Sequence, residues 1–98
     1  TRRGCRHARH IYALRAHDRR SVLWALEAEE IGYNIHYPVP VHLQPAYRHL
    51  GYHRGDFPVA ERCADEFISL PIFPELTPGQ VEHVAATVRE AADAFVIP

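Results

Sequence analysis

Residues 10–30 read HIYALRAHDRRSVLWALEAEE, and they predict a strand that passes directly into a helix. Residues 10–16 have a β-rich composition with apolar side chains on both faces, so we expect this strand to be buried on both sides. Residues 21–30 carry an apolar stripe on one side and three glutamates on the other, which is typical of a helix that covers a sheet. The stripe consists of Val22, Leu23 and Leu26.

Capping residues mark both ends of this helix. Asp18 and Ser21 each have a short polar side chain that can accept a hydrogen bond from the first turn, so both are candidates for the N-cap. Gly32 is predicted to close the helix at the C′ position, where the backbone turns left-handed.

Proline and glycine shape the next segment. Residues 33–37 predict a short second strand, and Pro38 and Pro40 stop it because proline has no amide hydrogen for a sheet ladder. Residues 43–50 predict a short helix that ends at Gly51.

A third helix and a third strand follow. Pro58 suits the first position of a helix that places Val59, Cys63 and Phe67 on one face. Residues 68–74, ISLPIFP, predict a strand that its two prolines stop.

The last helix has the clearest start signal. Thr77 as N-cap, Pro78 at the first helical position and Gln80 three residues after Thr77 form a capping box. One continuous apolar face follows. It consists of Val81, Val84, Ala85, Val88, Ala91, Ala92 and Phe95.

The predicted order, β-α-β-α-α-β-α, indicates an α/β fold in the form of an α+β-like small domain, with a three-stranded sheet covered by helices. Three strands are too few for a doubly wound nucleotide-binding fold. We expect residues 10–98 to form this domain and residues 1–9 to form a basic connector. Because two of the strands are short, we also expect the sheet to pack on another domain.

Composition narrows the class of protein. With 98 residues, 47% hydrophobic and 23% charged, the chain is one globular domain at most, and its apolar runs are too short to span a bilayer. The net charge is −1, but residues 1–20 hold seven arginines against the single Asp18. This basic end could contact phosphate or an acidic partner, although seven charges do not require a nucleic acid, and we expect none.

Two residue types limit the chemistry. All eleven basic residues are arginine, so no lysine amine is available in this chain. Cys5 and Cys63 lie far apart without a CxxC pattern, which favours two reduced thiols in a cytoplasmic protein.

Residues 34–47, NIHYPVPVHLQPAY, gather polar aromatic side chains on a backbone that prolines stiffen. Buried histidine and tyrosine need hydrogen-bond partners, so this stretch is suited to presenting side chains rather than to filling a core. His36, Tyr37 and His42 are predicted to face one pocket for a polyhydroxylated ligand. The alternative is that they only pack the turn.

The sequence gives less evidence for a metal site, an acid/base pair, a nucleophilic serine or a phosphate-binding loop. His49 and His53 are spaced for a shared zinc ion on one helix, but Gly51 lies between them, so we assign no metal ligands. Asp56 and Glu61 could form an acid/base pair, although a carboxylate beside a helix N-terminus is more often a cap. The two serines lack a GxSxG setting, and the isolated glycines form no phosphate-binding loop.

Three stretches, read in order, resemble a known family: HIYALRAHDRR, GYNIHYPVPVHLQPAY and GDFPVAERCADEFISLPIFPELTPGQVEHV. Together they resemble the C-terminal segment of the pyridoxal-phosphate-dependent nucleotide-sugar aminotransferases of the DegT/DnrJ/StrS group. The resemblance runs from about His10 to Val88. HYPxPxHxQxAY and PxAE followed by SLPxFPxLTxxQ are its most specific parts.

The resemblance implies the small C-terminal domain of a fold type I aminotransferase, a cytoplasmic homodimer that moves an amino group, usually from glutamate, onto a nucleotide-linked keto-sugar. In such enzymes a lysine binds pyridoxal phosphate through a Schiff base, and the ring serves as an electron sink. Because this chain has no lysine, its catalytic and cofactor-binding residues are expected in an N-terminal large domain. The alternative is a module kept only for binding or dimerisation, or a small histidine-rich protein that binds metal.

Matching positions carry the implied site. His36 falls on the family's active-site histidine, Tyr37 on the adjacent aromatic residue and His42 on the second histidine of the motif. Tyr12 and Arg15 match a Tyr/Arg pair for which interdomain packing is expected. The sequence departs from the family at Arg20, where the family has an acid, and this departure affects the local cap.

Overall fold

The computed structural model describes the backbone of residues 1–93 and the side chains of residues 1–92. These residues contain two strands, three α-helices and two short 3₁₀ helices. In chain order they are β1 (Tyr12–Arg15), α1 (Arg19–Ala28), η1 (Val41–Leu43), η2 (Pro45–Leu50), α2 (Pro58–Glu66), β2 (Phe67–Leu70) and α3 (Pro78–Asp93).

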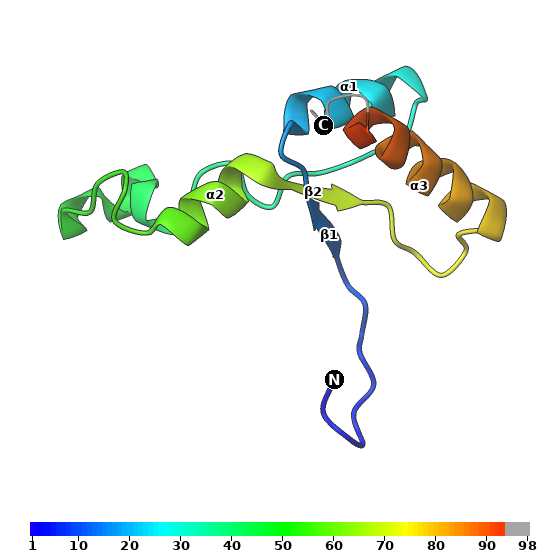
Figure 1. Cartoon of the computed structure of the whole chain (residues 1–98). Coiled ribbons are helices and arrows are strands. Elements are labelled where there is room, and N and C mark those ends of the chain that lie inside the picture. Colours follow the sequence, from blue (N-terminus) through cyan, green and yellow to red (C-terminus); the bar gives the residue numbers. More distant parts are fainter. Residues whose placement is uncertain (94–98) are drawn as a thin grey trace.

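The two strands pair in antiparallel fashion near the centre of the molecule. Tyr12 lies opposite Leu70, and Arg15 lies opposite Phe67. Helices α1 and α3 lie side by side at one end of this ribbon, whereas α2 and the 3₁₀ helices extend from the other end (Figure 1). The N-terminal residues leave β1 as an extended arm.

A small apolar core lies between the strands and the two packed helices. Leu26 and Ile68 are fully buried, and Val22 and Ala16 complete the cluster. Burying a leucine or isoleucine side chain stabilises a fold by roughly 1.5–3 kcal/mol, so these few residues dominate the packing free energy. Partly buried side chains surround them. These are Leu14, Leu23, Ile31, Tyr33, Leu70, Val88 and Ala91.

The sheet has two strands within residues 1–93, so the predicted three-stranded sheet is wrong, although helices packed on a sheet are confirmed. In place of the strand over 33–37, Asn34 forms a single bridge to Ser69. The Asn34 side chain then accepts a hydrogen bond from the amide of Ile35 at 2.8 Å. This local turn and the following prolines prevent the ladder from extending.

Both strands are shorter and more open than expected. Within this chain β1 is not buried on both sides, because Tyr12 is 60% exposed. The prediction fails because the ribbon is only two strands wide and the helices cover part of it. Strand β2 ends at Leu70 rather than at residue 74, since Pro71 has no amide hydrogen to donate.

Helix α1 begins as predicted and ends in a different way. Asp18 is the N-cap, and its carboxylate accepts hydrogen bonds from the amide and the hydroxyl of Ser21 at 3.3 and 2.7 Å. At the other end, Glu30 and not Gly32 adopts the left-handed conformation, with φ at 57°. The amides of Glu30 and Ile31 donate to the carbonyls of Glu27 and Leu26, which is the Schellman pattern. The apolar contact of Ile31 with the core selects this earlier end.

The predicted starts of α2 and α3 and the predicted helix end at Gly51 are confirmed. Pro58 occupies the first turn of α2, and Gly51 ends η2 with φ at 78°. The helix predicted over residues 43–50 is a 3₁₀ helix that begins at Pro45. Thr77 and Gln80 exchange backbone-to-side-chain hydrogen bonds at 3.0 and 3.2 Å, as a capping box requires.

The predicted faces of these helices are only partly confirmed. Helix α2 buries Glu61 and Ala64, so the predicted apolar face is wrong at Val59, which is 72% exposed. On α3, Val88 and Ala91 pack against the core as predicted, and Phe95 lies outside the described residues.

Replacing Glu30 with glycine is expected to stabilise the chain. A non-glycine residue in the left-handed region costs about 1 kcal/mol, and glycine removes this cost. We therefore expect the free energy of unfolding in urea to rise by about 0.5–1 kcal/mol. Ala28→Gly, two residues earlier and inside the helix, is the matched control and should lower it by a similar amount. A loss of stability in Glu30→Gly would contradict this account of the helix end.

Candidate functional site

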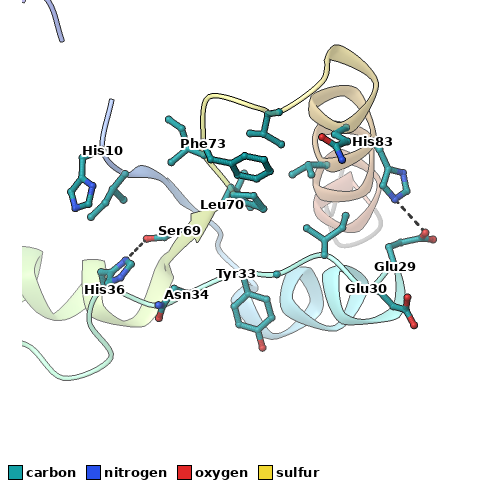
Figure 2. Close-up of a pocket in the computed structure, with 18 residues that line it drawn as sticks. His10, Glu29, Glu30, Tyr33, Asn34, His36, Ser69, Leu70, Phe73 and His83 are labelled. Atoms are coloured by element: carbon teal, nitrogen blue, oxygen red, sulfur yellow. Dashed lines mark hydrogen bonds and ion pairs between the residues drawn. The ribbon is translucent and has the colours of Figure 1, made fainter. Parts of the chain in front are cut away.

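An open groove of about 760 Å³ lies between the end of β2, the segment after α1 and the first turns of α3. Its two ends are polar and its middle is apolar (Figure 2). His10, Asn34, His36 and Ser69 line one end. Leu70, Phe73 and Leu76 are among the apolar residues of the middle, and Glu29, Gln80 and His83 line the other end.

His36 is the predicted site residue that lines this groove. Its side chain is half-buried, and its Nδ1 lies 2.8 Å from the hydroxyl oxygen of Ser69. The ring of Tyr37 meets the imidazole edge to face, with centroids 5.3 Å apart. His10 lines the same end of the groove, so two imidazoles border it. Such groups can donate to and accept from the hydroxyl and carbonyl groups of a ligand.

Tyr37 and His42 do not line this groove. Tyr37 is 68% exposed in this chain and is not among the residues that line the groove. His42 is buried, and its Nε2 lies 3.3 Å from a carboxylate oxygen of Glu61. The structure therefore does not bring the three predicted residues together in one cavity.

Glu61 forms several of the hydrogen bonds that hold the region around His42. Its carboxylate accepts backbone hydrogen bonds from Gly55 at 2.8 and 2.9 Å and from Phe57 at 3.2 Å. The Gly55 amide, followed by the Phe57 amide and His42, holds the pKa of Glu61 below its ordinary value, although burial opposes this shift. The ring of Phe57 also packs against His42, with centroids 4.9 Å apart. Glu61 thus ties the loop before α2 to η1.

The capping alternative is confirmed for Glu61 but not for Asp56, whose carboxylate closes the loop before α2. Asp56 accepts a hydrogen bond from the amide of His53 at 2.6 Å, and Glu61 accepts from the N-cap residue Phe57. Both carboxylates therefore hold backbone, and the structure gives no acid/base pair between them.

A second groove, of about 440 Å³ and mostly apolar, lies on β1 and α3. Tyr12 and Leu14 line one side, and Val81 and Val88 line the other. Arg15 does not point into this groove. Its guanidinium forms an ion pair with Glu66 at 2.8 Å.

The chain itself does not fit a bound pyridoxal phosphate. It contains no lysine, so no Schiff base to the cofactor can form on these 98 residues. Among residues 1–93, no three histidine, cysteine or acidic side chains lie close enough to hold a metal ion. Within the same part of the chain, no helix is long and apolar enough to cross a membrane.

Three residues of the groove were missed from the sequence. The sequence contains eight histidines, and no local pattern distinguishes His10 or His83, because their place at the groove depends on the packing of β1 and α3. Ser69 had a signal, since it is the one polar residue in the apolar segment FISL.

Comparison with known proteins identifies the family. The model of the DegT/DnrJ/EryC1/StrS aminotransferase family matches residues 1–89. The chain belongs to this family. The resemblance read from the HYPxPxHxQxAY and SLPxFP stretches is thereby confirmed.

Individual family members match most of the chain but only part of their own length. The erythromycin biosynthesis sensory transduction protein EryC1 of Saccharopolyspora erythraea is 45% identical over 83 residues, which are 85% of this chain and 23% of EryC1. The dTDP-3-amino-3,4,6-trideoxy-alpha-D-glucose transaminase of Micromonospora megalomicea subsp. nigra is 38% identical over 89% of this chain and 24% of its own length. The chain thus spans about a quarter of the curated relatives it matches.

A solved structure shares the fold. S. venezuelae DesV, crystallised in complex with a ketimine intermediate, matches with a TM-score of 0.80 and 38% identity. The match covers 91% of this chain and 24% of DesV. The arrangement of two strands and packed helices therefore also occurs as part of the longer chain of DesV.

Glu61 should make the stability of the fold depend on pH in the acid range. Because its pKa is lowered in the fold, the unfolded state takes up its proton first as pH falls. Its contribution is complete above the ordinary value of 4.5 and is lost as pH falls through the lowered pKa. Glu61→Gln should lower the melting temperature at pH 7 and flatten the fall in melting temperature between about pH 5 and pH 3.

Glu82→Gln is the control for this experiment, because Glu82 is exposed on α3. It should leave the pH profile unchanged. An equally steep acid limb in the wild type and in Glu61→Gln would exclude this role of Glu61.

Proposed function

We propose that this chain is the C-terminal part of a pyridoxal-phosphate-dependent aminotransferase that transfers an amino group, from glutamate, to a nucleotide-linked keto-sugar. The proposal rests on the position of His36. It occupies the HYP motif of the family and lies in the structure at the polar end of the main groove. The relatives named for dTDP-sugar transamination support this substrate class.

In this proposal, one domain binds the cofactor and the other binds the sugar. Pyridoxal phosphate, held by a lysine of a preceding large domain, would supply the electron sink for amino transfer. This chain would bind and orient the sugar. Hydroxyl and carbonyl oxygens suit the end with His10, His36 and Ser69, and the apolar middle of the groove would keep water from the reacting centre.

We assign different tasks to the three predicted substrate-binding residues. His36 contacts the sugar. Tyr37, an exposed residue, packs on the ring of His36 and would support its orientation. His42 fixes the loop that follows Tyr37 through its contact with Glu61, so its contribution to substrate binding is indirect.

We also propose how this chain contacts the rest of the enzyme. Residues 1–9 would connect to the large domain, and the second, apolar groove would face it, because such a groove excludes water best when another domain covers it. We further propose a cytoplasmic homodimer, as the family resemblance implies.

His36→Ala in the full-length protein is expected to lower kcat/KM for a dTDP-linked keto-sugar by about 10- to 100-fold. Loss of a hydrogen bond that a ligand needs costs about 1–3 kcal/mol. The absorbance of bound pyridoxal phosphate should not change, since the cofactor is held outside this chain. His49→Ala, at an exposed histidine of η2, is the control and should keep full turnover. Unchanged turnover in His36→Ala would remove His36 from the site.

Val81→Asp tests the covered groove. Val81 is 51% exposed in this chain and lines the apolar groove. If another domain covers it, the aspartate is buried in a mostly apolar groove, which costs several kcal/mol. The melting temperature of the full-length protein should therefore fall by about 5 °C or more. Ala86→Asp, at an exposed position of the same helix that does not line the groove, is the matched control. Equal melting temperatures for the two variants would show that the groove faces solvent.

A further inference from the structure

Ser69 is a buried polar residue in an apolar strand. It is 7% exposed, and its neighbours in β2 are Phe67, Ile68 and Leu70. Its hydroxyl oxygen lies 2.8 Å from His36 Nδ1, as the dashed line between the two side chains shows (Figure 2). If this hydrogen bond had no function, alanine could replace the buried serine at little cost in stability.

The position of this hydroxyl is fixed by the backbone. The amide of Asn34 donates to the Ser69 carbonyl at 3.0 Å, and the amide of Ser69 donates to the Asn34 carbonyl at 2.7 Å. On its other side Ser69 lies opposite Ala13 in the β ladder. Asn34 is two residues before His36, so the same bridge that places the hydroxyl also places the histidine.

The direction of the hydrogen bond between Ser69 and His36 follows from the other partners open to the hydroxyl. Among residues 1–93, the bond to His36 is the one that the Ser69 hydroxyl forms. A buried hydroxyl hydrogen without an acceptor costs about 1–3 kcal/mol, whereas an unused oxygen lone pair costs less. The hydroxyl therefore donates to Nδ1. Neutral His36 then carries its proton on Nε2, the ring nitrogen that remains for a ligand.

We infer that Ser69 is a positioning residue that fixes the orientation and the tautomer of His36, so that the histidine presents an Nε2–H donor to the groove. In this state His36 binds an oxygen of its ligand and does not act as a base. The inference rests on the proposed function for the identity of the ligand, a keto-sugar whose carbonyl or hydroxyl oxygen accepts this hydrogen bond. The tautomer itself does not depend on that function.

The first test measures the tautomer in the ligand-free full-length protein. Nitrogen-15 NMR of the labelled histidine rings, at a pH where His36 is neutral, distinguishes a protonated ring nitrogen from an unprotonated one. The signal of His36 is assigned by its loss in His36→Ala. We expect Nε2 to be protonated and Nδ1 to accept in the wild type, and a mixture of the two tautomers in Ser69→Ala. Protonation of Nδ1 in the wild type, or an unchanged tautomer in Ser69→Ala, would overturn the inference.

The second test measures amino transfer from glutamate to a dTDP-linked keto-sugar. Ser69→Ala should lower kcat/KM by about 10-fold, which corresponds to one neutral hydrogen bond, and Ser69→Thr, which keeps the hydroxyl, should restore most of it. In the His36→Ala background, Ser69→Ala should cause no further loss, because the two residues act as a unit. A full 10-fold loss in that background would show that Ser69 supports the fold rather than His36.

The only other serine of the chain provides the matched control. Ser21→Ala removes a hydroxyl that donates to Asp18, away from the groove, and it should leave both the tautomer of His36 and the turnover unchanged. The two tests also separate the two claims. If His36→Ala keeps full turnover while the tautomer shifts in Ser69→Ala, the proposed function of His36 fails and the positioning by Ser69 stands.

Discussion

The antiparallel pairing of β1 with β2 is the interaction on which the rest of the structure depends. It joins residues 12–15 to residues 67–70, which are separated by the whole middle of the chain. Helix α1 follows β1 and helix α3 follows β2, so this pairing brings the two helices side by side and closes the core around Leu26 and Ile68. The main groove is bordered by the segments that leave these elements. A loss of the pairing would therefore remove the core and the site together.

Local signals in the sequence were sufficient for most helix starts. The capping box at Thr77 and Gln80, the N-cap at Asp18 and the proline at the start of α2 are all interactions between residues at most a few positions apart. Their geometry depends on the local backbone, so a sequence pattern can identify them. The end of α1 was missed because Ile31 and the core select Glu30 over Gly32 for the left-handed position, and that choice depends on tertiary packing.

The arrangement of the site was harder to predict, because its contacts join distant residues. Residues 33–37 were predicted to form a strand, but the structure gives one bridge, from Asn34 to Ser69. The family motif identified His36, whereas its partner Ser69 lies 33 residues further along the chain. His42 was predicted to face the pocket, and instead it is held by Glu61, 19 residues away. Spacing within one segment carries no information about such partners.

The two grooves have one wall in common. Leu70, Pro71, Ile72 and Leu76 line both of them, one groove on each side of the segment that leaves β2. This partition contains a proline and follows directly after Ser69, which limits how far its backbone can move independently of the strand. A displacement of this segment would therefore change both grooves at the same time. A domain that packed into the apolar groove and displaced this segment would therefore also change the shape of the polar groove.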